Sequence, residues 1–463
     1  MENKNNRTIS RRDFFKIAGA AGMATAGLTA CGDRQGSLTS ANAGEPGGEM
    51  TYRTLTGDRV SLLGYGCMRW PMMPNPDGEG QVVDQEEVNR LVDYALAHGV
   101  NYFDTAPPYC QGLSEEATGI ALSRHPRDSY YIATKMSNHR LYGAGLRGKE
   151  LHDASVKMYR DSFKHLRTDY FDYYLFHILG TGKGMEEMRG RLYDCDIADF
   201  ILKEKEAGRI RKLGFSFHGD VRVFDYMLQE SGIPWDFVQI QLNYLDWRHA
   251  SGINVNAEYL YGELAKRNIP AVIMEPLLGG RLSKVHDHIV TKLKQRESGQ
   301  SVASWAFRFA GSFPGVLTVL SGMTYMEHLQ DNLRTYSPLH PLSEDEFAFL
   351  QETANLMVQY QTIPCNDCKY CMPCPYGIDI PAILLHYNKC INEGNMPRSG
   401  QDEDYRRARR AFLVGYDRSV PKLRQANHCI GCNQCSPDCP QGIDIPKEMQ
   451  RIDHFVERLK QDN

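Results

Sequence analysis

Eight of the thirteen cysteines in this 463-residue chain lie in two short runs near its C-terminal end. The first run, CNDCKYCMPCP, has the spacing C-x2-C-x2-C-x2-C-P, and the second, CIGCNQCSPDCP, has the spacing C-x2-C-x2-C-x3-C-P. Cysteines at this density form disulfides, bind zinc or bind iron–sulfur clusters. The cysteines of the two runs are Cys365, Cys368, Cys371, Cys374, Cys429, Cys432, Cys435 and Cys439.

The spacing favours iron–sulfur clusters over the two alternatives. The second run has the bacterial ferredoxin pattern, in which three cysteines bind one [4Fe–4S] cluster and the fourth binds another. Zinc sites usually pair two C-x2-C units across a longer loop, which these runs lack. Cysteines two residues apart are too close to join distant segments in the way that structural disulfides do.

An internal repeat indicates that the two runs arose by duplication. CPYGIDIP, which starts at Cys374, recurs as CPQGIDIP, which starts at Cys439. The intervening sequence has helical patterns, so we predict an α-helical, ferredoxin-like domain with two [4Fe–4S] clusters over residues 357–463. The first run is one residue shorter than the ferredoxin pattern, and nothing in the sequence explains this. The predicted ligand sets are Cys365, Cys368, Cys371 with Cys439, and Cys429, Cys432, Cys435 with Cys374.

Upstream of the cysteines, short β-branched or aromatic runs alternate with amphipathic helical patterns. Residues 86–99 show the helical pattern, with apolar residues at helical spacing from Val88 onwards and a stop at Gly99. Eight strands, each followed by a helix, predict a (β/α)8 TIM barrel over residues 50–356. The predicted strands are residues 61–66, 101–106, 130–135, 171–177, 212–217, 237–243, 271–276 and 316–322.

Titratable side chains stand at the carboxyl ends of adjacent predicted strands, where barrels of this type carry their chemistry. A single tyrosine or histidine at such a place is compatible with ordinary packing. Several at neighbouring strand ends indicate a catalytic site. The residues are Asp104 and Tyr109 after the second strand, Lys135 after the third, His177 after the fourth, Ser216 after the fifth and Gln239 in the sixth.

Residues 50–335 resemble the aldo/keto reductase family. The segments NYFDTAPPYCQGLSEEATGIAL, IATK, DYYLFH, GRIRKLGFSFH and QIQLNY occur in the family's order. The resemblance implies a tetrad of Asp104, Tyr109, Lys135 and His177 that reduces a carbonyl or oxidises an alcohol. Tyr109 would be the general acid, with its pKa lowered by Lys135. Asp104 would hold the lysine, and His177 would orient the substrate carbonyl.

The same resemblance implies contacts to a nicotinamide dinucleotide, from which this chain departs in part. Phe217 stands where the family commonly has asparagine, and residues 321–324 lack the Lys or Arg that usually clamps a 2′-phosphate. NAD, NADP, a tightly held dinucleotide and no dinucleotide therefore remain open, and no flavin motif is evident. The implied contacts are Ser216 and Gln239 to the carboxamide, Met274 at the stacking position and Asn332 to the adenine.

The N-terminal residues predict an export signal. Arg11 and Arg12 precede an apolar stretch over residues 17–30 that is short for a membrane span, and LTAC ends at Cys31. We predict a twin-arginine, lipoprotein-type signal over residues 1–31 and a flexible polar tether over residues 32–49. The protein would then be periplasmic or extracytoplasmic and anchored to the membrane by lipid on Cys31. The alternative is that a cysteine follows the apolar stretch by chance.

Composition predicts a globular protein without a nucleic-acid partner, since the net charge is −4, the pI is about 6.4 and no basic stripe is present. We therefore expect an exported oxidoreductase that acts on a small carbonyl or alcohol and exchanges electrons with an unidentified redox partner through two clusters. The alternative is an electron-transfer or otherwise non-catalytic iron–sulfur protein whose barrel has lost nicotinamide-dependent activity.

Overall fold

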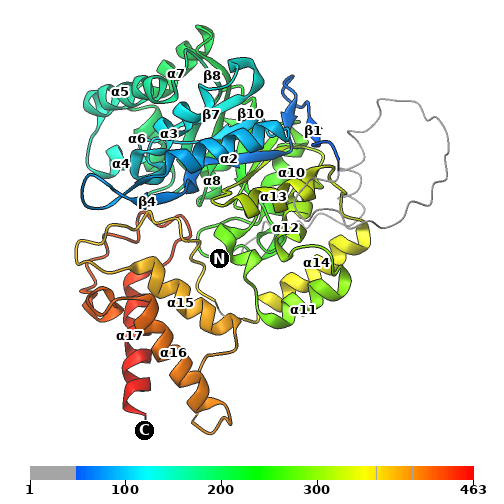
Figure 1. Ribbon diagram of the computed structural model, residues 1–463. Helices are drawn as coiled ribbons and strands as arrows, with labels where there is room; N and C mark the ends of the chain where they lie inside the picture. Colours follow the sequence, from blue (N-terminus) through cyan, green and yellow to red (C-terminus); the bar gives the residue numbers. More distant parts are fainter. Residues whose placement is uncertain (1–47, 361, 399, 463) are drawn as a thin grey trace, which may run out of the picture.

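The computed structural model describes residues 48–360, 362–398 and 400–462. Eight parallel strands close into a barrel in chain order, with the last strand paired to the first (Figure 1). All eight predicted strands are present, and the (β/α)8 prediction is confirmed. The strands are β3 (Leu63–Gly66), β6 (Tyr102–Asp104), β7 (Tyr131–Met136), β8 (Phe171–Leu179), β9 (Ile210–Phe217), β10 (Phe237–Gln241), β11 (Ala271–Met274) and β12 (Val316–Ser321).

A helix follows each strand and covers the outside of the barrel. Helix α2 shows why these segments are helical: Asp84 caps its first turn by accepting from the Glu87 amide, and Val88 and Leu91 lie on its buried face. The eight covering helices are α2 (Gln85–Ala97), α3 (Ser114–Leu122), α5 (Gly148–Leu166), α7 (Ile197–Glu206), α8 (Val221–Gln229), α10 (Ala257–Lys266), α12 (Val302–Gly311) and α13 (Met326–Tyr336).

Shorter elements decorate the two ends of the barrel. The hairpin of β1 (Tyr52–Arg53) and β2 (Val60–Ser61) precedes the first barrel strand, and the hairpin of β4 (Met72–Pro74) and β5 (Gln81–Val83) follows it. The carboxyl-end loops also carry two 3-10 helices, η2 (Tyr109–Gly112) and η4 (Leu278–Ser283). The remaining helices of the barrel region are α4 (His139–Gly143), α6 (Met185–Leu192), α9 (Asp246–His249), α11 (Asp287–Arg296) and α14 (Glu344–Met357).

The C-terminal domain packs three helices, α15 (Ile380–Asn392), α16 (Tyr405–Ser419) and α17 (Ile445–Gln461), around an apolar core of its own. The duplicated GIDIP sequence starts two of them. Asp379 and Asp444 each accept a hydrogen bond from an amide in the first turn, and a proline follows two residues later. A capping carboxylate followed by proline in the first turn favours a helix start. The repeat therefore fixes where both helices begin.

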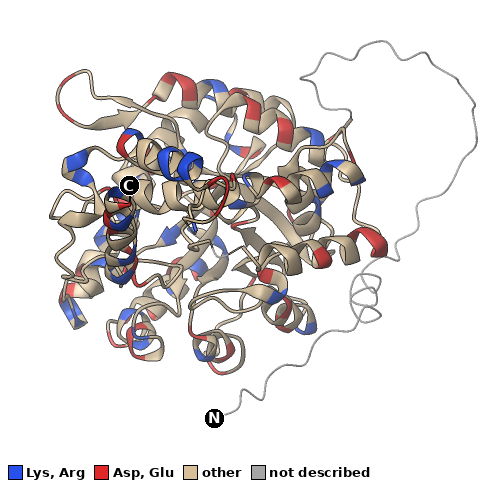
Figure 2. Ribbon diagram, turned by 90° about the horizontal axis from the view of Figure 1, so that it is seen from below, with Lys and Arg blue, Asp and Glu red and all other residues tan. Residues whose placement is uncertain are grey.

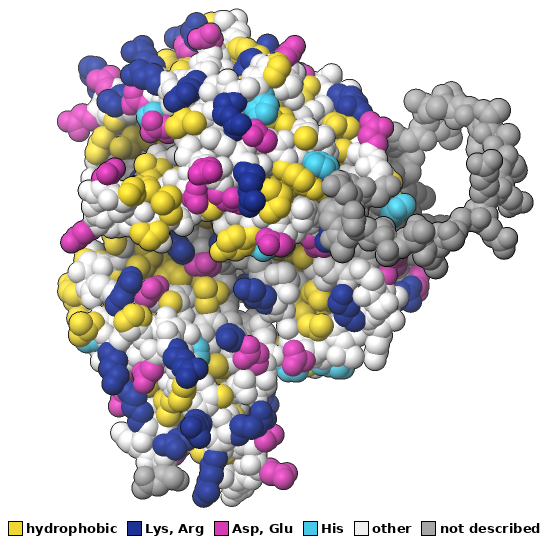
Figure 3. Space-filling view, viewed as in Figure 1, with side chains coloured by type: hydrophobic (Ala, Val, Ile, Leu, Met, Phe, Trp, Pro, Cys, Tyr) yellow, Lys and Arg dark blue, Asp and Glu magenta, His cyan; other side chains and the backbone are white. Residues whose placement is uncertain are grey.

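The cysteine-bearing loops lie between the three helices and the barrel, beside β4 and α4 (Figure 1). Apolar side chains gather along this seam, and basic side chains are spread over the C-terminal domain below it (Figure 3). Acidic and basic side chains are interspersed over the helices of both domains (Figure 2). Across the described residues, every helix is too short or too polar to span a bilayer. The predicted export signal and most of the predicted tether lie outside the described residues.

The close packing of α3 on α5 gives a stability prediction. A Cβ atom on Gly119 would lie 2.1 Å from the backbone oxygen of His165, so Gly119→Ala must push the two helices apart. Overpacking of this kind costs about 1–3 kcal/mol. We expect a lower thermal midpoint for Gly119→Ala than for Gly143→Ala, whose Cβ would meet nothing within 4 Å. Equal midpoints measured by circular dichroism would contradict this packing.

Candidate active site and cluster ligands

The four tetrad residues come together at the carboxyl rim of the barrel. Asp104 ends β6, Tyr109 starts η2, Lys135 lies near the end of β7 and His177 lies in β8. The Lys135 Nζ donates to Asp104 Oδ1 at 2.6 Å and to the Thr105 carbonyl at 2.7 Å. Both charged side chains are buried. The parallel strands thus place side chains from distant parts of the sequence in one polar cluster.

The Asp104–Lys135 pair is held in a desolvated setting. Burial raises the pKa of Asp104 and lowers the pKa of Lys135, while the attraction between the two partners opposes both shifts. Asp104 Oδ2 has no hydrogen-bond partner among the described residues. Removing either partner would leave an uncompensated charge in the barrel, which costs about 3–5 kcal/mol.

Tyr109 lies against both the lysine and the histidine. The Lys135 Nζ is 4.7 Å from the centroid of its ring, and the His177 ring stands edge-on at 5.8 Å. Burial raises the pKa of Tyr109 well above its usual value, and nearby Tyr370 and Asp104 raise it further. Lys135 was expected to lower that pKa. Its ammonium is instead bonded to Asp104 and Thr105, and burial of the phenol outweighs it. The phenol is therefore protonated at neutral pH, as a proton donor must be.

His177 is a neutral imidazole in this site. Burial, followed by the nearby Lys135, lowers its pKa well below the usual value. The Ser137 hydroxyl lies 2.7 Å from His177 Nδ1, and the His139 ring lies 5.4 Å from the His177 ring. When Ser137 donates to Nδ1, the proton of the ring is on Nε2. Sequence reasoning missed Ser137 and His139, although both follow Lys135 within four residues.

The predicted dinucleotide contacts are present in part. Gln239 Oε1 is buried without a hydrogen-bond partner among the described residues, while its Nε2 is 3.5 Å from the Met274 sulfur. The Ser216 hydroxyl accepts from the Ile178 amide at 2.7 Å. Asn332 is buried and donates to the Ser321 hydroxyl at 2.9 Å. The nicotinamide end of the predicted site thus offers an unpaired carboxamide oxygen, and Asn332 is already engaged within the barrel.

Tyr370, from the middle of the first cysteine run, reaches the tetrad. The Tyr109 and Tyr370 hydroxyls interact with each other. The guanidinium of Arg140 in α4 lies 5.4 Å from the centroid of the Tyr370 ring. Sequence reasoning missed this contact, because Tyr370 belongs to the other domain and no local pattern links it to the barrel.

The structure brings cysteines of the two runs close to one another, and the crossed sets stay a prediction. Electrostatic neighbours of Cys371 include Cys368, Cys365 and Cys439, and burial together with these neighbours raises its pKa. Burial raises the pKa of Cys435 to about 11, and its neighbours include Cys429, Cys374 and Cys432. Cys439 is thus a neighbour of Cys365, Cys368 and Cys371, and Cys374 is a neighbour of Cys435.

The chemistry of these donors fits two iron–sulfur clusters. All twelve cysteines in the described part of the chain are free of disulfides. In that part, no three His, Cys, Asp or Glu side chains lie close enough together to bind a single metal ion. A cluster of four irons holds its ligand sulfurs farther apart than a single ion does. Cys365 is buried and its neighbour Asn366 contacts the barrel, whereas Cys432 is exposed. The set that contains Cys365 is therefore the inner one, beside Tyr370.

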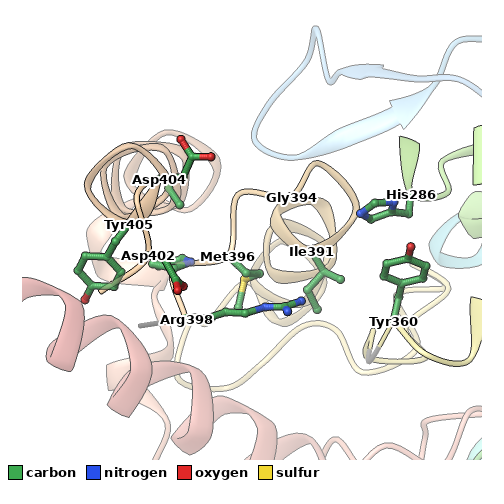
Figure 4. A pocket seen from close by; sticks show the side chains of 11 residues that line it. His286, Tyr360, Ile391, Gly394, Met396, Arg398, Asp402, Asp404 and Tyr405 are labelled. Carbon is green, nitrogen blue, oxygen red and sulfur yellow. The ribbon is translucent and has the colours of Figure 1, made fainter. Parts of the chain in front are cut away.

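Two cavities lie along the seam between the domains, away from the tetrad. One, of about 280 Å³, is bounded by His286 and Tyr360 on the barrel side and by Ile391, Met396 and Arg398 on the other (Figure 4). The His286 and Tyr360 rings stack at 4.2 Å. The other cavity, of about 220 Å³, shares these two aromatic residues. Neither cavity contains a predicted site residue.

Comparison with known proteins agrees with this architecture. The model described as "Aldo/keto reductase family" matches residues 62–355, and the model described as "4Fe-4S dicluster domain" matches residues 364–444. Aldo-keto reductase YhdN of Bacillus subtilis is 25% identical over 292 residues, which is 59% of this chain and 85% of that protein. L-galactose dehydrogenase of Arabidopsis thaliana is 23% identical over 311 residues, 63% of this chain and 89% of that enzyme.

Solved structures show the same fold. An aldo-keto reductase from Bacillus halodurans aligns with a TM-score of 0.50 at 22% identity, over 66% of this chain and 96% of that protein. A thermostable aldo-keto reductase, solved with the inhibitor epalrestat, aligns with a TM-score of 0.51 at 23% identity, over 66% of this chain and all of that protein. The barrel and the clustered cysteines together define this protein as an oxidoreductase. The chain belongs to the aldo/keto reductase family and carries a C-terminal 4Fe-4S dicluster domain.

The predicted ligand sets can be tested by iron content. Anaerobically purified protein should carry about eight iron atoms per chain, and Cys368→Ala should retain about four, because one cluster loses a ligand. Cys390→Ala is the matched control, since Cys390 is a buried cysteine of the same domain that lies outside both sets. Full iron content in Cys368→Ala, or an equal loss in Cys390→Ala, would contradict the assignment.

Proposed function

We propose that the barrel interconverts a small carbonyl compound and its alcohol, and that the dicluster domain carries electrons between this site and a redox partner. The observation that carries the proposal is the assembled tetrad, in which the Tyr109 ring lies beside the buried Lys135–Asp104 pair and the His177 ring. The substrate carbonyl oxygen would take the place of the Tyr370 hydroxyl and accept a hydrogen bond from Tyr109.

Each side chain has a distinct role in carbonyl reduction. Tyr109 donates the proton to the carbonyl oxygen as charge develops there. His177 donates from Nε2 when Ser137 holds its Nδ1, which orients the same oxygen. Lys135 places a positive charge 4.7 Å from the Tyr109 ring and stabilises the phenolate that remains after proton transfer. Asp104 holds the lysine in this position. In alcohol oxidation the same groups act in reverse.

The eight run cysteines would hold the clusters, with Cys365, Cys368, Cys371 and Cys439 on the barrel side. When bound, each cluster would supply or accept one electron at a time. Reduction of a carbonyl to its alcohol would therefore take two successive electrons from the redox partner through the clusters and two protons, one from Tyr109 and one from solvent. The exposed Cys432 belongs to the outer set, so the redox partner would approach the surface around it.

A second function is favoured by the departures at the dinucleotide contacts. Phe217, Met274 and the absence of Lys or Arg from residues 321–324 are compatible with an electron-transfer protein whose barrel does not catalyse. Because the tetrad is complete and hydrogen-bonded, we place this function second.

Substitution of the proton donor separates the two functions. With reduced methyl viologen as electron donor under anaerobic conditions, Tyr109→Phe should reduce the turnover of aldehydes such as 4-nitrobenzaldehyde and butanal by about 10²–10⁴-fold. The visible absorbance of the clusters should be unchanged. Tyr376→Phe, an exposed tyrosine of the C-terminal domain, is the control. Undiminished turnover in Tyr109→Phe would exclude the catalytic role, and a wild-type protein that reduces no carbonyl would favour electron transfer alone.

We also propose export by the twin-arginine route with lipid attachment at Cys31, as the sequence predicts. In a bacterial host with this pathway, substitution of Arg11 and Arg12 by lysine should leave the protein in the cytoplasm. Cys31→Ser should instead release exported protein from the membrane fraction. Fractionation and immunoblotting measure both outcomes. Membrane association that survives Cys31→Ser would argue against lipidation.

A further inference from the structure

The start of the C-terminal domain crosses the mouth of the barrel. We use "first cysteine segment" for residues 362–371, which run from the end of the barrel region to the third cysteine of the first run. A dinucleotide bound as the resemblance implies would extend from Gln239 and Met274 to Asn332. It would have to pass over the end of β11 and the loop that carries η4. The first cysteine segment lies on this loop.

Contacts of Asn366 place the segment directly against the loop. Asn366 is buried, and its Nδ2 donates to Glu275 Oε1 at 2.8 Å. A Cβ atom on Gly279 would lie 2.1 Å from the Asn366 carbonyl oxygen and 2.6 Å from its Cβ. The backbone of the segment therefore packs on a glycine that has no room for a side chain, and no phosphate fits between them.

Two arginines at the mouth are already engaged by the segment. The Arg69 Nη2 donates to the Asn366 carbonyl at 2.6 Å, and its Nη1 lies 3.7 Å from the Asp367 carboxylate. The Arg281 Nη2 donates to the Thr362 hydroxyl at 3.0 Å. Phosphates in binding sites are usually held by arginine, lysine or backbone amides. Here the cations nearest the route hold the polypeptide.

The loop also contributes a buried carboxyl group to the contacts with the segment. Glu275 has a left-handed φ of 55°, and its Oε2 is buried without a hydrogen-bond partner among the described residues. Its Oε1 accepts from Asn366, so this side chain of the loop also holds the segment. At the inner end of the segment, the Tyr370 hydroxyl interacts with that of Tyr109, so the segment extends from the cofactor route to the tetrad.

We propose that the first cysteine segment is the resident occupant of the groove in which a dinucleotide would lie, so that this barrel does not bind NAD(H) or NADP(H) there. Residues 362–367 fill the route between the nicotinamide and adenine ends, and Tyr370 covers the tetrad. The proposal concerns binding alone, and it is independent of the carbonyl on which the barrel acts.

A matched pair of glycine variants tests whether the first cysteine segment occupies the groove. Gly279 and Gly280 both have left-handed φ values, of +65° and +102°, so alanine strains the backbone at either position. A Cβ on Gly280 meets only the Ser283 hydroxyl at 4.0 Å, whereas one on Gly279 collides with Asn366. Gly279→Ala should therefore displace the segment that carries Cys365 and Cys368.

The readout is electron paramagnetic resonance of the dithionite-reduced holoprotein, with iron content measured in parallel. We expect Gly279→Ala to change or lose the signal of one cluster and Gly280→Ala to retain both signals, as the wild type does. Identical spectra and iron contents for the two variants would overturn the proposal, because the segment would then be free of the Gly279 loop.

Titration of the wild-type holoprotein provides a second measurement that does not depend on the folding of a variant. Isothermal titration calorimetry with NADH and with NADPH, taken to millimolar concentration under anaerobic conditions, should show no saturable binding. Saturable binding of either dinucleotide would overturn the proposal. The aldehyde assay with Tyr109→Phe reports on the catalytic role separately, so failure of one proposal leaves the other distinguishable.

Discussion

The parallel closure of the barrel is the constraint on which the rest of this structure depends. Because all eight strands run in one direction, with β12 paired to β3, every strand ends on the same rim. Asp104 and Lys135 come from neighbouring strands and meet there at 2.6 Å. The cysteine-rich domain docks on this rim as well, so a single geometric condition brings together the tetrad, the loop after β11 and the first cysteine run.

The buried ion pair of Lys135 and Asp104 bears on the function of the rim. A buried charge pair contributes little to stability, because the cost of desolvation offsets much of the attraction. An apolar pair of similar volume would fill the barrel at least as well. What the Lys135–Asp104 pair provides is a fixed positive charge beside the Tyr109 ring, in a setting where burial keeps both the phenol and His177 neutral. The chemistry of the site, more than the stability of the fold, accounts for these residues.

The two domains are joined by polar contacts as well as by packing. Arg69, Arg281 and Glu275 from the barrel bind residues 362–367, while Asn254 on the barrel donates to the Gln441 side chain after the second run at 2.9 Å. Both cysteine runs are therefore seated on the barrel, and Cys439 of the second run lies near the first three cysteines of the first. Cys365 and Cys368 of the first run lie close to Tyr370 and the tetrad, whereas Cys432 of the second run is exposed. Under the proposed function, this arrangement would give an electron route with one end at the substrate site.

The sequence by itself determined the elements and the residue types. The eight strands, the start of α2 near residue 85 and the helix starts in the duplicated GIDIP follow from local periodicity and capping, which act over a few residues. The ligand spacing likewise predicts the iron–sulfur domain. Tertiary structure alone decided that Tyr370 meets Tyr109, that Ser137 and His139 flank His177, and that Asn366 packs on Gly279. It also decided the sign of the pKa shift at Tyr109, since burial depends on what covers the barrel mouth. These contacts join residues as far as 261 positions apart. The packing of the strands and of the two domains selects the partners in these contacts. No pattern within a single segment records that packing.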